Sequence, residues 1–442
     1  MIRKIPNEIK EILLTLSGNG YEAYLVGGCV RDILMDRNPN DFDIASNAMP
    51  EDIIRIFGED KTCPTGIKYG TVTVFTNNMS AEITHYRSDG TYSDFRTPDN
   101  VTFVSDIHSD LLRRDFTINA MALSADGKLI DDFGGIGHIS ERMISCVGKP
   151  QQRFSEDALR ILRAVRFASE LDFEISPETS NALIELSPNL EKISAERIRN
   201  ELNRIICGKN CGDVLKRYSD VFSVFIPEIK KSIGFEQHSP YHKYNVWEHT
   251  AEAVSASVCN LTIRLTMLLH DVAKPLVFYS DETGRGHFKG HDKLGSEIAG
   301  DILKRLKYEK KTISDVTSLI YYHSVKVKNV TDIKKLLSKL GERLFFMLFD
   351  VKRADNSAKN DFVLVELEEF EEIEKKAAEI LRNNECISLS QLAVNGNDLI
   401  KIGITGKKTG EILNYLLNLV IEDKIDNSYD TLISKAYEMV EC

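Results

Sequence analysis

The chain has 442 residues, 42% of them hydrophobic and 28% charged, and a formal net charge of −11. This length exceeds what one hydrophobic core can serve, so we expect three or more structural units. The composition is that of an ordinary globular protein without the roughly 18-residue apolar run of a membrane span, so we expect no membrane partner. Taken alone, the negative charge also disfavours a polyanionic partner.

The N-terminal segment "MIRKIPNEIKEILLTLSGNG" predicts an amphipathic helix that ends at Gly18-Asn19-Gly20 and is not a signal peptide. Eight cysteines are scattered along the chain without the spacing of a disulfide framework. Cys207 and Cys211 have no second pair that would complete a zinc site. We therefore expect reduced thiols and a cytoplasmic protein.

Residues 21–145 have the pattern of a mixed α/β domain. "EAYLVGG" predicts a strand that enters a glycine turn, "CVRDILM" begins a helix, and "FDIAS" is a second strand. "MPEDIIRIFG" predicts a helix with a proline in its first turn. "YGTVTVFTNNMSAEITHYR" predicts two strands around an Asn-Asn turn.

Asp41 and Asp43 accompany the second strand, separated by one residue. On a strand, residues i and i+2 face the same side with Cα atoms about 6.6–7 Å apart, so the two carboxylates can share a divalent cation such as Mg²⁺. The alternative is that Asp41 caps a turn and Asp43 faces solvent. The upstream residues favour the metal site, because the amides that follow Gly27-Gly28 at a helix start can bind phosphate and Arg31 adds a guanidinium.

From about residue 150 the pattern becomes helical, first in "SEDALRILRAVRFASEL". Ser155 is a suitable N-cap for this helix. The next charged residues are spaced by three and would form one ridge on the helix surface: Asp157, Arg160, Arg163 and Arg166. A solvated charged face is the alternative, but all three cations are arginine, which suits planar bidentate recognition. Helices follow in "SPETSNALIELS" and "SAERIRNELNRIICG".

The glycine turn and the D-x-D strand together resemble the polymerase-β-like nucleotidyltransferases. Four further segments occur in order: "LLRRDFTINAMAL", "DDFGG", "SEDALRILRAVRF" and "ISAERIRNELNRII". Over roughly residues 20–206 this set resembles the class II tRNA CCA-adding enzymes and the bacterial poly(A) polymerases. "LAVNGNDLIKIGITGKKTGEIL" near the C-terminus resembles the tail of CCA-adding enzymes.

The resemblance implies roles for particular residues. Asp41 and Asp43 would bind Mg²⁺, with Glu82 as a candidate third carboxylate whose alternative is a solvent-facing strand residue. Two bound metals would activate a hydroxyl and stabilise in-line displacement at an α-phosphate. The implied nucleotide-binding residues are Gly28, Arg31, Arg114, Asp115, Asn119, Asp157, Arg160, Arg163 and Arg166.

Asp157 and Arg160 offer a way to choose a base. Cytosine and adenine both present an amino donor beside a ring-nitrogen acceptor, which match a carboxylate and a guanidinium. Guanine and uracil present the reverse pattern and would leave buried charges unpaired. The counterpart of the family's switch from CTP to ATP is residues 86–103, with Arg87, Asp89 and Arg96. Its presence favours addition of the terminal A.

Six basic residues between Arg142 and Arg166 predict a local basic face for a tRNA acceptor stem, despite the overall charge. Seven of the ten histidines lie between His238 and His323. Four residues there and beyond resemble, in their order, the metal ligands of HD-domain phosphohydrolases: His249, His270, Asp271 and Asp355. His291 and His323 resemble ligands of a second metal.

A satisfied core histidine is the alternative for each single member of this set. The bound metal, which we expect to be a divalent transition metal, would support phosphatase or 2′,3′-cyclic phosphodiesterase activity, or would only stabilise the domain.

The expected architecture is α+β, with a polymerase-β-like nucleotidyltransferase head (1–145), a helical neck (146–235), an HD domain (236–360) and a helical tail (361–442). The expected function is template-independent addition or repair of the tRNA 3′-CCA end from CTP and ATP. The alternatives are a poly(A) polymerase, an A-only-adding enzyme, or an RNA-binding HD-type phosphohydrolase.

Overall fold

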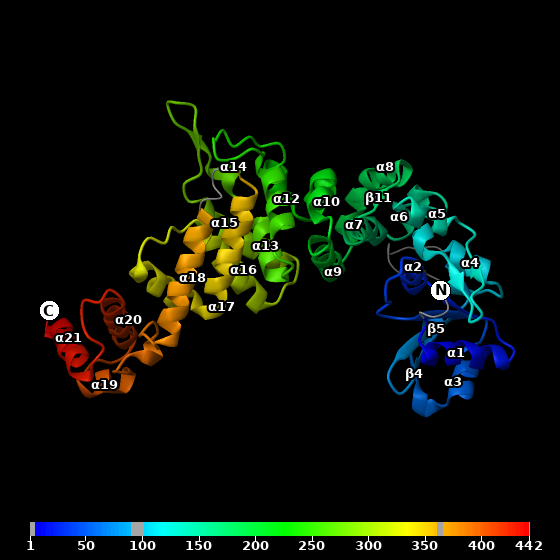
Figure 1. Ribbon diagram of the computed structural model, residues 1–442, viewed down its shortest axis with the longest axis horizontal. Helices are drawn as coiled ribbons and strands as arrows, with labels where there is room; N and C mark the ends of the chain where they lie inside the picture. The colour runs from blue at the N-terminus through cyan, green and yellow to red at the C-terminus, as the bar shows by residue number, and fades with distance from the viewer. Residues whose placement is uncertain (1–4, 90–100, 360–365, 442) are drawn as a thin grey trace. The chain divides into compact units, whose positions relative to one another are not determined.

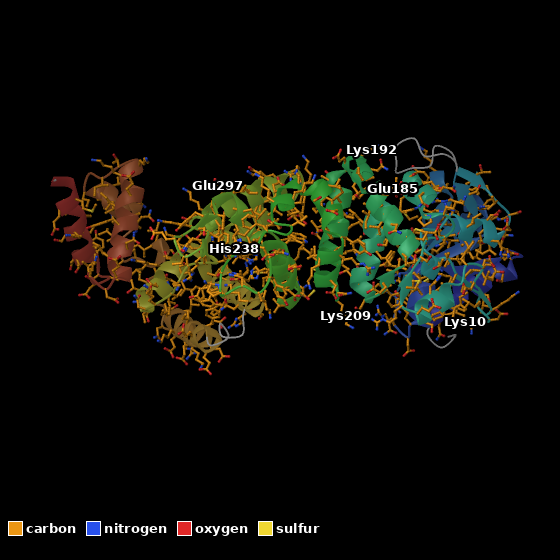
Figure 2. All side chains as sticks on the ribbon, turned by 90° about the horizontal axis from the view of Figure 1, so that it is seen from above. Lys10, Glu185, Lys192, Lys209, His238 and Glu297 are labelled. Carbon is orange, nitrogen blue, oxygen red and sulfur yellow. The ribbon has the colours of Figure 1, made fainter. Side chains whose placement is uncertain are left out.

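The computed structural model describes residues 5–89, 101–359 and 366–441 (Figure 1). By its internal contacts the chain divides into two compact units, Met1–Lys230 and Lys231–Cys442. Figure 2 adds the side chains, and the labelled Glu185, Lys209 and Glu297 are exposed, as is usual for charged residues. In the described part of the chain, no helix has the length and apolar character needed to cross a membrane.

A seven-stranded mixed sheet organises the first half of unit 1, in the order β3-β4-β5-β2-β1-β8-β9. Its strands are β1 (Ala23–Val26), β2 (Asp43–Ser46), β3 (Thr62–Gly66), β4 (Thr71–Phe75), β5 (Ser80–His85), β8 (Ala122–Leu123) and β9 (Leu129–Ile130). Strands β2 and β5 are parallel, and the other neighbouring pairs are antiparallel.

Both faces of this sheet are covered. Leu25 and Ile44 pack in a large apolar cluster with α1 (Asn7–Gly18) and α3 (Pro50–Phe57), which contact each other (Figure 1). The next residues, Val26 and Ala45, belong to a second cluster with α4 (Ile107–Leu112). Successive strand residues thus serve opposite faces, as the two-residue period of a strand requires.

Helices make up most of the rest of unit 1. They are α2 (Gly28–Leu34), α5 (Gly135–Ser140), α6 (Pro150–Glu156), α7 (Leu159–Leu171), α8 (Pro177–Leu186), α9 (Ala195–Ile206), α10 (Cys211–Arg217) and α11 (Ser219–Phe225). Two short pairs of strands join them: β6 (Arg87–Asp89) with β7 (Val101–Phe103), and β10 (Met143–Ile144) with β11 (Glu174–Ile175). Helix α7 packs on α9.

Among its described residues, unit 2 has one pair of strands, β12 (Tyr279–Ser280) and β13 (Gly286–His287), and is otherwise built from helices and their connections. Its helices are α12 (Val246–Ala256), α13 (Leu261–Leu269), α14 (Lys274–Val277), α15 (His291–Arg305), α16 (Lys310–Tyr322), α17 (Val330–Ser357), α18 (Glu366–Arg382), α19 (Gly396–Lys401), α20 (Lys407–Ile421) and α21 (Tyr429–Glu441). Helices α12, α13 and α16 pack around α17, and α19–α21 share a separate apolar cluster.

The expected α+β class is confirmed, but the expected single helix from Ser155 is wrong. Helix α6 starts at Pro150 and ends at Glu156, and α7 begins at Leu159. Asp157 lies between them with φ −136° and accepts a hydrogen bond from the amide of Leu159 at 2.9 Å. A short polar side chain that binds nearby backbone in this way competes with the helix. Asp157 is therefore not part of the arginine ridge on α7.

Gly208, just after α9, permits the close packing of α9 on α7. A Cβ on Gly208 would lie 2.8 Å from both the Cβ and the carbonyl carbon of Ser169. We expect Gly208→Ala to lower the free energy of unfolding by about 1–3 kcal/mol through overpacking. Gly137→Ala is the control, because nothing lies within 4 Å of its Cβ position. Urea unfolding midpoints measure both, and equal midpoints would contradict this packing.

Candidate functional site

Three carboxylates gather at the start of β2. Phe42 is buried while Asp41 and Asp43 on either side are exposed, so the two carboxylates face the same side, with Asp41 in the turn before the strand. Glu82 of β5 is the register partner of Asp43, and its amide donates to the carbonyl of Phe42. Desolvation by the surrounding protein atoms raises the pKa of Asp43, and so do the negative charges of Glu82 and Asp41. The positive charge of Arg114 lowers it. A cation would relieve this repulsion.

The glycine turn lies beside these carboxylates. Gly27 has φ +78°, and a Cβ there would lie 3.1 Å from Nη1 of Arg114 and 3.5 Å from Oδ2 of Asp43. Only glycine allows both this backbone conformation and this approach. Helix α2 begins at Gly28 directly afterwards. Arg114 itself is held by Asp110, which accepts from its Nη2 at 3.0 Å.

The predicted residues Arg31, Asn119, Asp115 and Arg163 form one continuous network. Nη1 of Arg31 donates to Oδ1 of Asn119 at 2.8 Å, and Arg31 also pairs with Asp32. Nδ2 of Asn119 donates to Asp115 at 3.3 Å, and Nε of Arg163 donates to the other oxygen of Asp115 at 2.8 Å. The network joins α2 behind the glycine turn to α7.

The arginines of α7 do not form the exposed basic face that the sequence suggested. Arg160 and Arg166 are only 9% and 5% exposed. Nη1 of Arg160 donates to Glu156 at 2.5 Å, and Arg166 pairs with Glu201 at 3.3 Å. Each arginine of the ridge therefore has a carboxylate partner. These carboxylates compensate the positive charge of the three α7 arginines.

The segment predicted to act as a switch is described only at its ends. Arg87 and Asp89 lie on β6, which pairs with β7. Nη1 of Arg87 donates to the carbonyl of Tyr69 at 2.8 Å. Arg96 lies outside the described residues.

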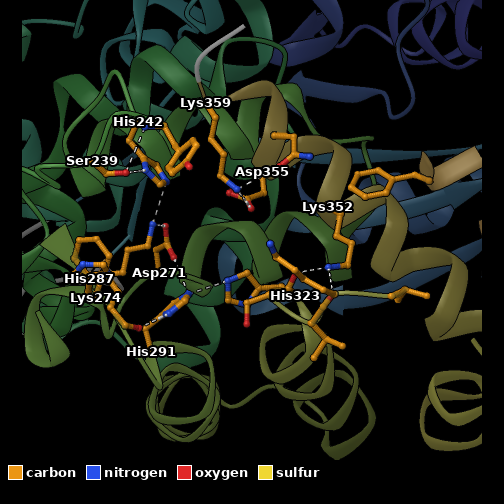
Figure 3. Close-up of a pocket in the computed structure, with 18 of the residues that line it drawn as sticks. Ser239, His242, Asp271, Lys274, His287, His291, His323, Lys352, Asp355 and Lys359 are labelled. Carbon is orange, nitrogen blue, oxygen red and sulfur yellow. Dashed lines mark hydrogen bonds and ion pairs between the residues drawn. The ribbon is translucent and has the colours of Figure 1, made fainter. Parts of the chain in front are cut away.

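The expected histidine and aspartate cluster is present in unit 2 (Figure 3). Its donor atoms fall in two groups, each within 4.8 Å: one of His249, His270 and Asp355, the other of Asp271, His291 and His323. The ligands come from α12, the end of α13, the start of α15, the end of α16, and α17. Nε2 of His249 lies 3.0 Å from Asp355, and Nε2 of His291 lies 3.1 Å from Nε2 of His323.

The other ring nitrogen of these four histidines faces a backbone carbonyl. Nδ1 of His249, His270, His291 and His323 lies 3.2, 2.8, 2.8 and 2.6 Å from its carbonyl oxygen. The carbonyl requires the proton on Nδ1, so Nε2 is the ring nitrogen that each histidine has left for a metal, as in metal sites with an ordered outer shell. Burial lowers the pKa of His249 and His291, and that of His323 to about 3. Burial also acts on His270, but Asp271 raises its pKa to about 9.

The donor set fits a metal, because Oδ1 of Asp271 is buried and accepts no hydrogen bond from the described residues. The cluster borders a cavity of about 550 Å³. Lys274 lies 2.7 Å from Asp271, and Lys359 lies 2.6 Å from Asp355. Lys352 donates to the carbonyl of His323 at 2.6 Å (Figure 3). These lysines give the cavity the charge that an anion would need.

Sequence reasoning did not identify several residues that the site contains. Asp110 fixes Arg114, Glu156 binds Arg160, and Arg197 binds Asp157 at 2.9 Å. Helical spacing could not reveal these partners, since Arg197 and Asp157 are 40 residues apart. A signal was available for Lys274, which lies one turn after His270-Asp271 in "HDVAK".

Three family models match this chain. The poly A polymerase head domain matches residues 23–145, and the probable RNA and SrmB-binding site of polymerase A matches residues 172–233. The putative tRNA nucleotidyltransferase domain 2 matches residues 292–436. The first match contains the three carboxylates and the glycine turn.

Curated relatives agree with these matches. A CCA-adding enzyme of Enterococcus faecalis is 48% identical over 209 residues, which are 47% of this chain and 51% of that protein. The chain thus spans about half the length of that relative and of several others. A CCA-adding enzyme of Lactobacillus helveticus is 32% identical over 423 residues, 95% of this chain and 94% of that protein.

The crystal structure of the Bacillus stearothermophilus CCA-adding enzyme in complex with CTP superposes with a TM-score of 0.72 at 26% identity. The similarity covers 98% of this chain and 97% of that chain. Together with the carboxylates and the glycine turn of unit 1, these similarities show that the chain belongs to the family of CCA-adding enzymes.

Proposed function

We propose that the protein is a tRNA nucleotidyltransferase that adds or repairs the 3′-terminal CCA, using CTP and ATP without a nucleic acid template. The observation that carries the proposal is the set of three carboxylates, with Asp43 and Glu82 in register on parallel strands beside the Gly27 turn. The solved relative in complex with CTP supports the choice of CTP, and the match to the putative tRNA nucleotidyltransferase domain 2 supports that of tRNA. The cysteines that the structure describes are all free thiols, which supports a reducing cytoplasmic location.

Members of this family depend on a divalent metal, and we propose Mg²⁺ for this chain. Asp41, Asp43 and Glu82 offer only oxygen donors, which suit a hard cation that also binds substrate phosphate. When bound there, Mg²⁺ supplies charge stabilisation at the α-phosphate under attack by the tRNA 3′ hydroxyl. The amides at the start of α2 and the guanidinium of Arg114 bind the triphosphate beside these carboxylates.

Addition to three tRNA substrates tests the proposal against its rivals. The substrates end before CCA, before CA and before A, and each nucleotide is supplied singly. We expect C on the first two and A on the third, with no addition from GTP or UTP. Addition of A to all three would indicate a poly(A) polymerase, and addition of A to the third alone would indicate an A-only enzyme.

Loss of a metal-binding carboxylate tests the head site. We expect Asp43→Asn to lower the rate of C addition at least about 100-fold, because loss of an outer-shell residue alone costs 10–100-fold in metal sites. The control is Asp60→Asn, an exposed carboxylate of the same domain. Quenched-flow measurement with saturating CTP reports the rate. Addition that survives in Asp43→Asn at the parent rate would refute the site.

We propose that Asp157 and Arg160 recognise the base. Asp157 has one donor on each oxygen, Leu159 on Oδ1 and Arg197 on Oδ2, so each oxygen can still accept from a base amino group. Arg160 would donate to the ring nitrogen of the base. To do so it would give up one of its present hydrogen bonds, which go to the carboxylate of Glu156 and the carbonyls of Arg153 and Arg113. Both residues lie at the junction of α6 and α7, Asp157 in the link between the helices and Arg160 in the first turn of α7.

The choice of base should depend on these two groups. A site built to bond a substrate group rejects analogues that lack it, by up to 10⁴–10⁵-fold. We therefore expect Asp157→Asn to reduce discrimination against UTP and GTP by at least about tenfold, since an amide can also donate. Asp172→Asn, which removes an exposed partner of Arg142, is the control. Single-nucleotide kcat/KM values measure discrimination, and unchanged ratios would count against this assignment.

A second candidate activity is hydrolysis of a phosphate ester in unit 2. The specific observation is the cluster of four histidines and two aspartates beside a cavity that five lysines help to line. Nitrogen and carboxylate donors suit a transition metal, and we propose that the cluster binds one or two such divalent ions. The lysines would bind the phosphate group, in accordance with the HD-type phosphohydrolase activity considered from the sequence.

Metal content tests this second site without reference to activity. We expect Asp271→Asn to lose most of the bound transition metal, because it removes the charged ligand of the group that also contains His291 and His323. His287→Ala is the control, since His287 pairs with Asp281 outside the cluster. Elemental analysis of the purified proteins gives the metal per chain. We also expect the variant to lose hydrolysis of 2′,3′-cyclic nucleotides and to retain C addition, and equal metal content would refute the site.

A further inference from the structure

Arg197 of α9 is the ion-pair partner of Asp157, and Nη2 of Arg197 donates to Oδ2 of Asp157 at 2.9 Å. We propose that Arg197 is a positioning residue for base selection, which fixes the carboxylate of Asp157 in the orientation that accepts the amino group of cytosine or adenine. The inference rests on the proposed function, because it presumes that Asp157 contacts the base.

Two independent elements hold the Asp157 carboxylate. Its Oδ1 accepts from the amide of Leu159 at the first turn of α7, and its Oδ2 accepts from Arg197 on α9. A carboxylate bonded at both oxygens has a fixed plane, and each oxygen keeps a lone pair for one more donor. Asp157 lies in a non-helical link with φ −136° and ψ 106°, so the helical backbone does not fix its side chain. Arg197 supplies the second constraint.

The neighbouring arginines are occupied elsewhere. Arg163 binds Asp115, and Arg160 binds Glu156. Arg197 is the cation hydrogen-bonded to the Asp157 carboxylate, and its contact is largely shielded, with side-chain exposures of 23% and 14%. Its Nη1 is buried and has no hydrogen-bond partner among the described residues. Among the described residues, Asp157 is therefore the carboxylate that binds the guanidinium of Arg197.

Arg204 provides a matched comparison on the same helix. It also forms an ion pair with a carboxylate of the α7 region, Nε to Glu170 at 2.7 Å, but this pair lies away from Asp157 and the Arg204 side chain is 55% exposed. Loss of a purely structural ion pair would lower stability in either variant without a change in base discrimination. A positioning role would affect only Arg197.

The experiment uses the full chain as Arg197→Met, Arg197→Lys and Arg204→Met, with single additions of CTP, ATP, UTP and GTP to the three tRNA substrates. We expect Arg197→Met to raise KM for CTP and ATP about tenfold and to lower discrimination against UTP and GTP by a similar factor. Arg197→Lys should recover part of the discrimination, because an ammonium still donates to the carboxylate but without the planar fork. Arg204→Met should match the parent in KM and in discrimination against UTP and GTP.

Two results would overturn the proposal. In the first, Arg197→Met keeps KM and discrimination within twofold of the parent. In the second, its kcat falls equally for all four nucleotides while KM and discrimination stay unchanged, as for a general loss of folded protein; thermal unfolding of each variant checks the folded state. A parent protein that fails to add C and A would instead refute the proposed function, so the two failures are distinguishable.

Discussion

The ion pair between the buried carboxylate of Asp115 and Arg163 is the interaction on which the arrangement of unit 1 depends. The carboxylate accepts from the amide of Phe116, from Asn119 and from Arg163, so both of its oxygens are satisfied. Burial alone would raise its pKa, but Arg163 holds the pKa of Asp115 at about 2. The carboxylate therefore stays charged at neutral pH. Loss of Arg163 would leave the buried Asp115 carboxylate without its cation, and an unpaired buried charge is destabilising.

The Asp115–Arg163 pair connects the region of the glycine turn to helix α7. Asn119 joins Asp115 to Arg31, whose helix begins at the glycine turn beside Asp43. Arg163 joins the same carboxylate to α7, at whose start Asp157 and Arg160 lie. The proposed sites of chemistry and of base selection belong to residues more than a hundred positions apart in the sequence. A rigid hydrogen-bonded network keeps them in register without a covalent link.

The local chemistry of the chain was predictable, while the partners of its charges were not. The hairpin that carries Glu82 and the glycine turn before α2 depend on residues close in sequence, and both form as predicted, whereas β2 begins at Asp43 and leaves Asp41 outside the strand. The break at Asp157 was missed because helical spacing continues through it, although its side chain binds the next turn. Arg163 meets a carboxylate 48 residues away, which no periodicity encodes. Half of the six basic residues counted between Arg142 and Arg166, the three on α7, are therefore paired with carboxylates.

The two proposed metal sites differ in chemistry in a way that separates their ions. The head offers three exposed carboxylates, those of Asp43 and Glu82 on neighbouring strands and that of Asp41 just before them, and oxygen donors that repel one another favour a small hard cation. Unit 2 offers imidazoles whose Nδ1 atoms face carbonyl oxygens, so Nε2 is the nitrogen that each presents to a metal. Nitrogen donors arranged in this way bind transition metals far better than Mg²⁺. One chain can thus use two kinds of ion at once, because ligand type selects the ion at each site.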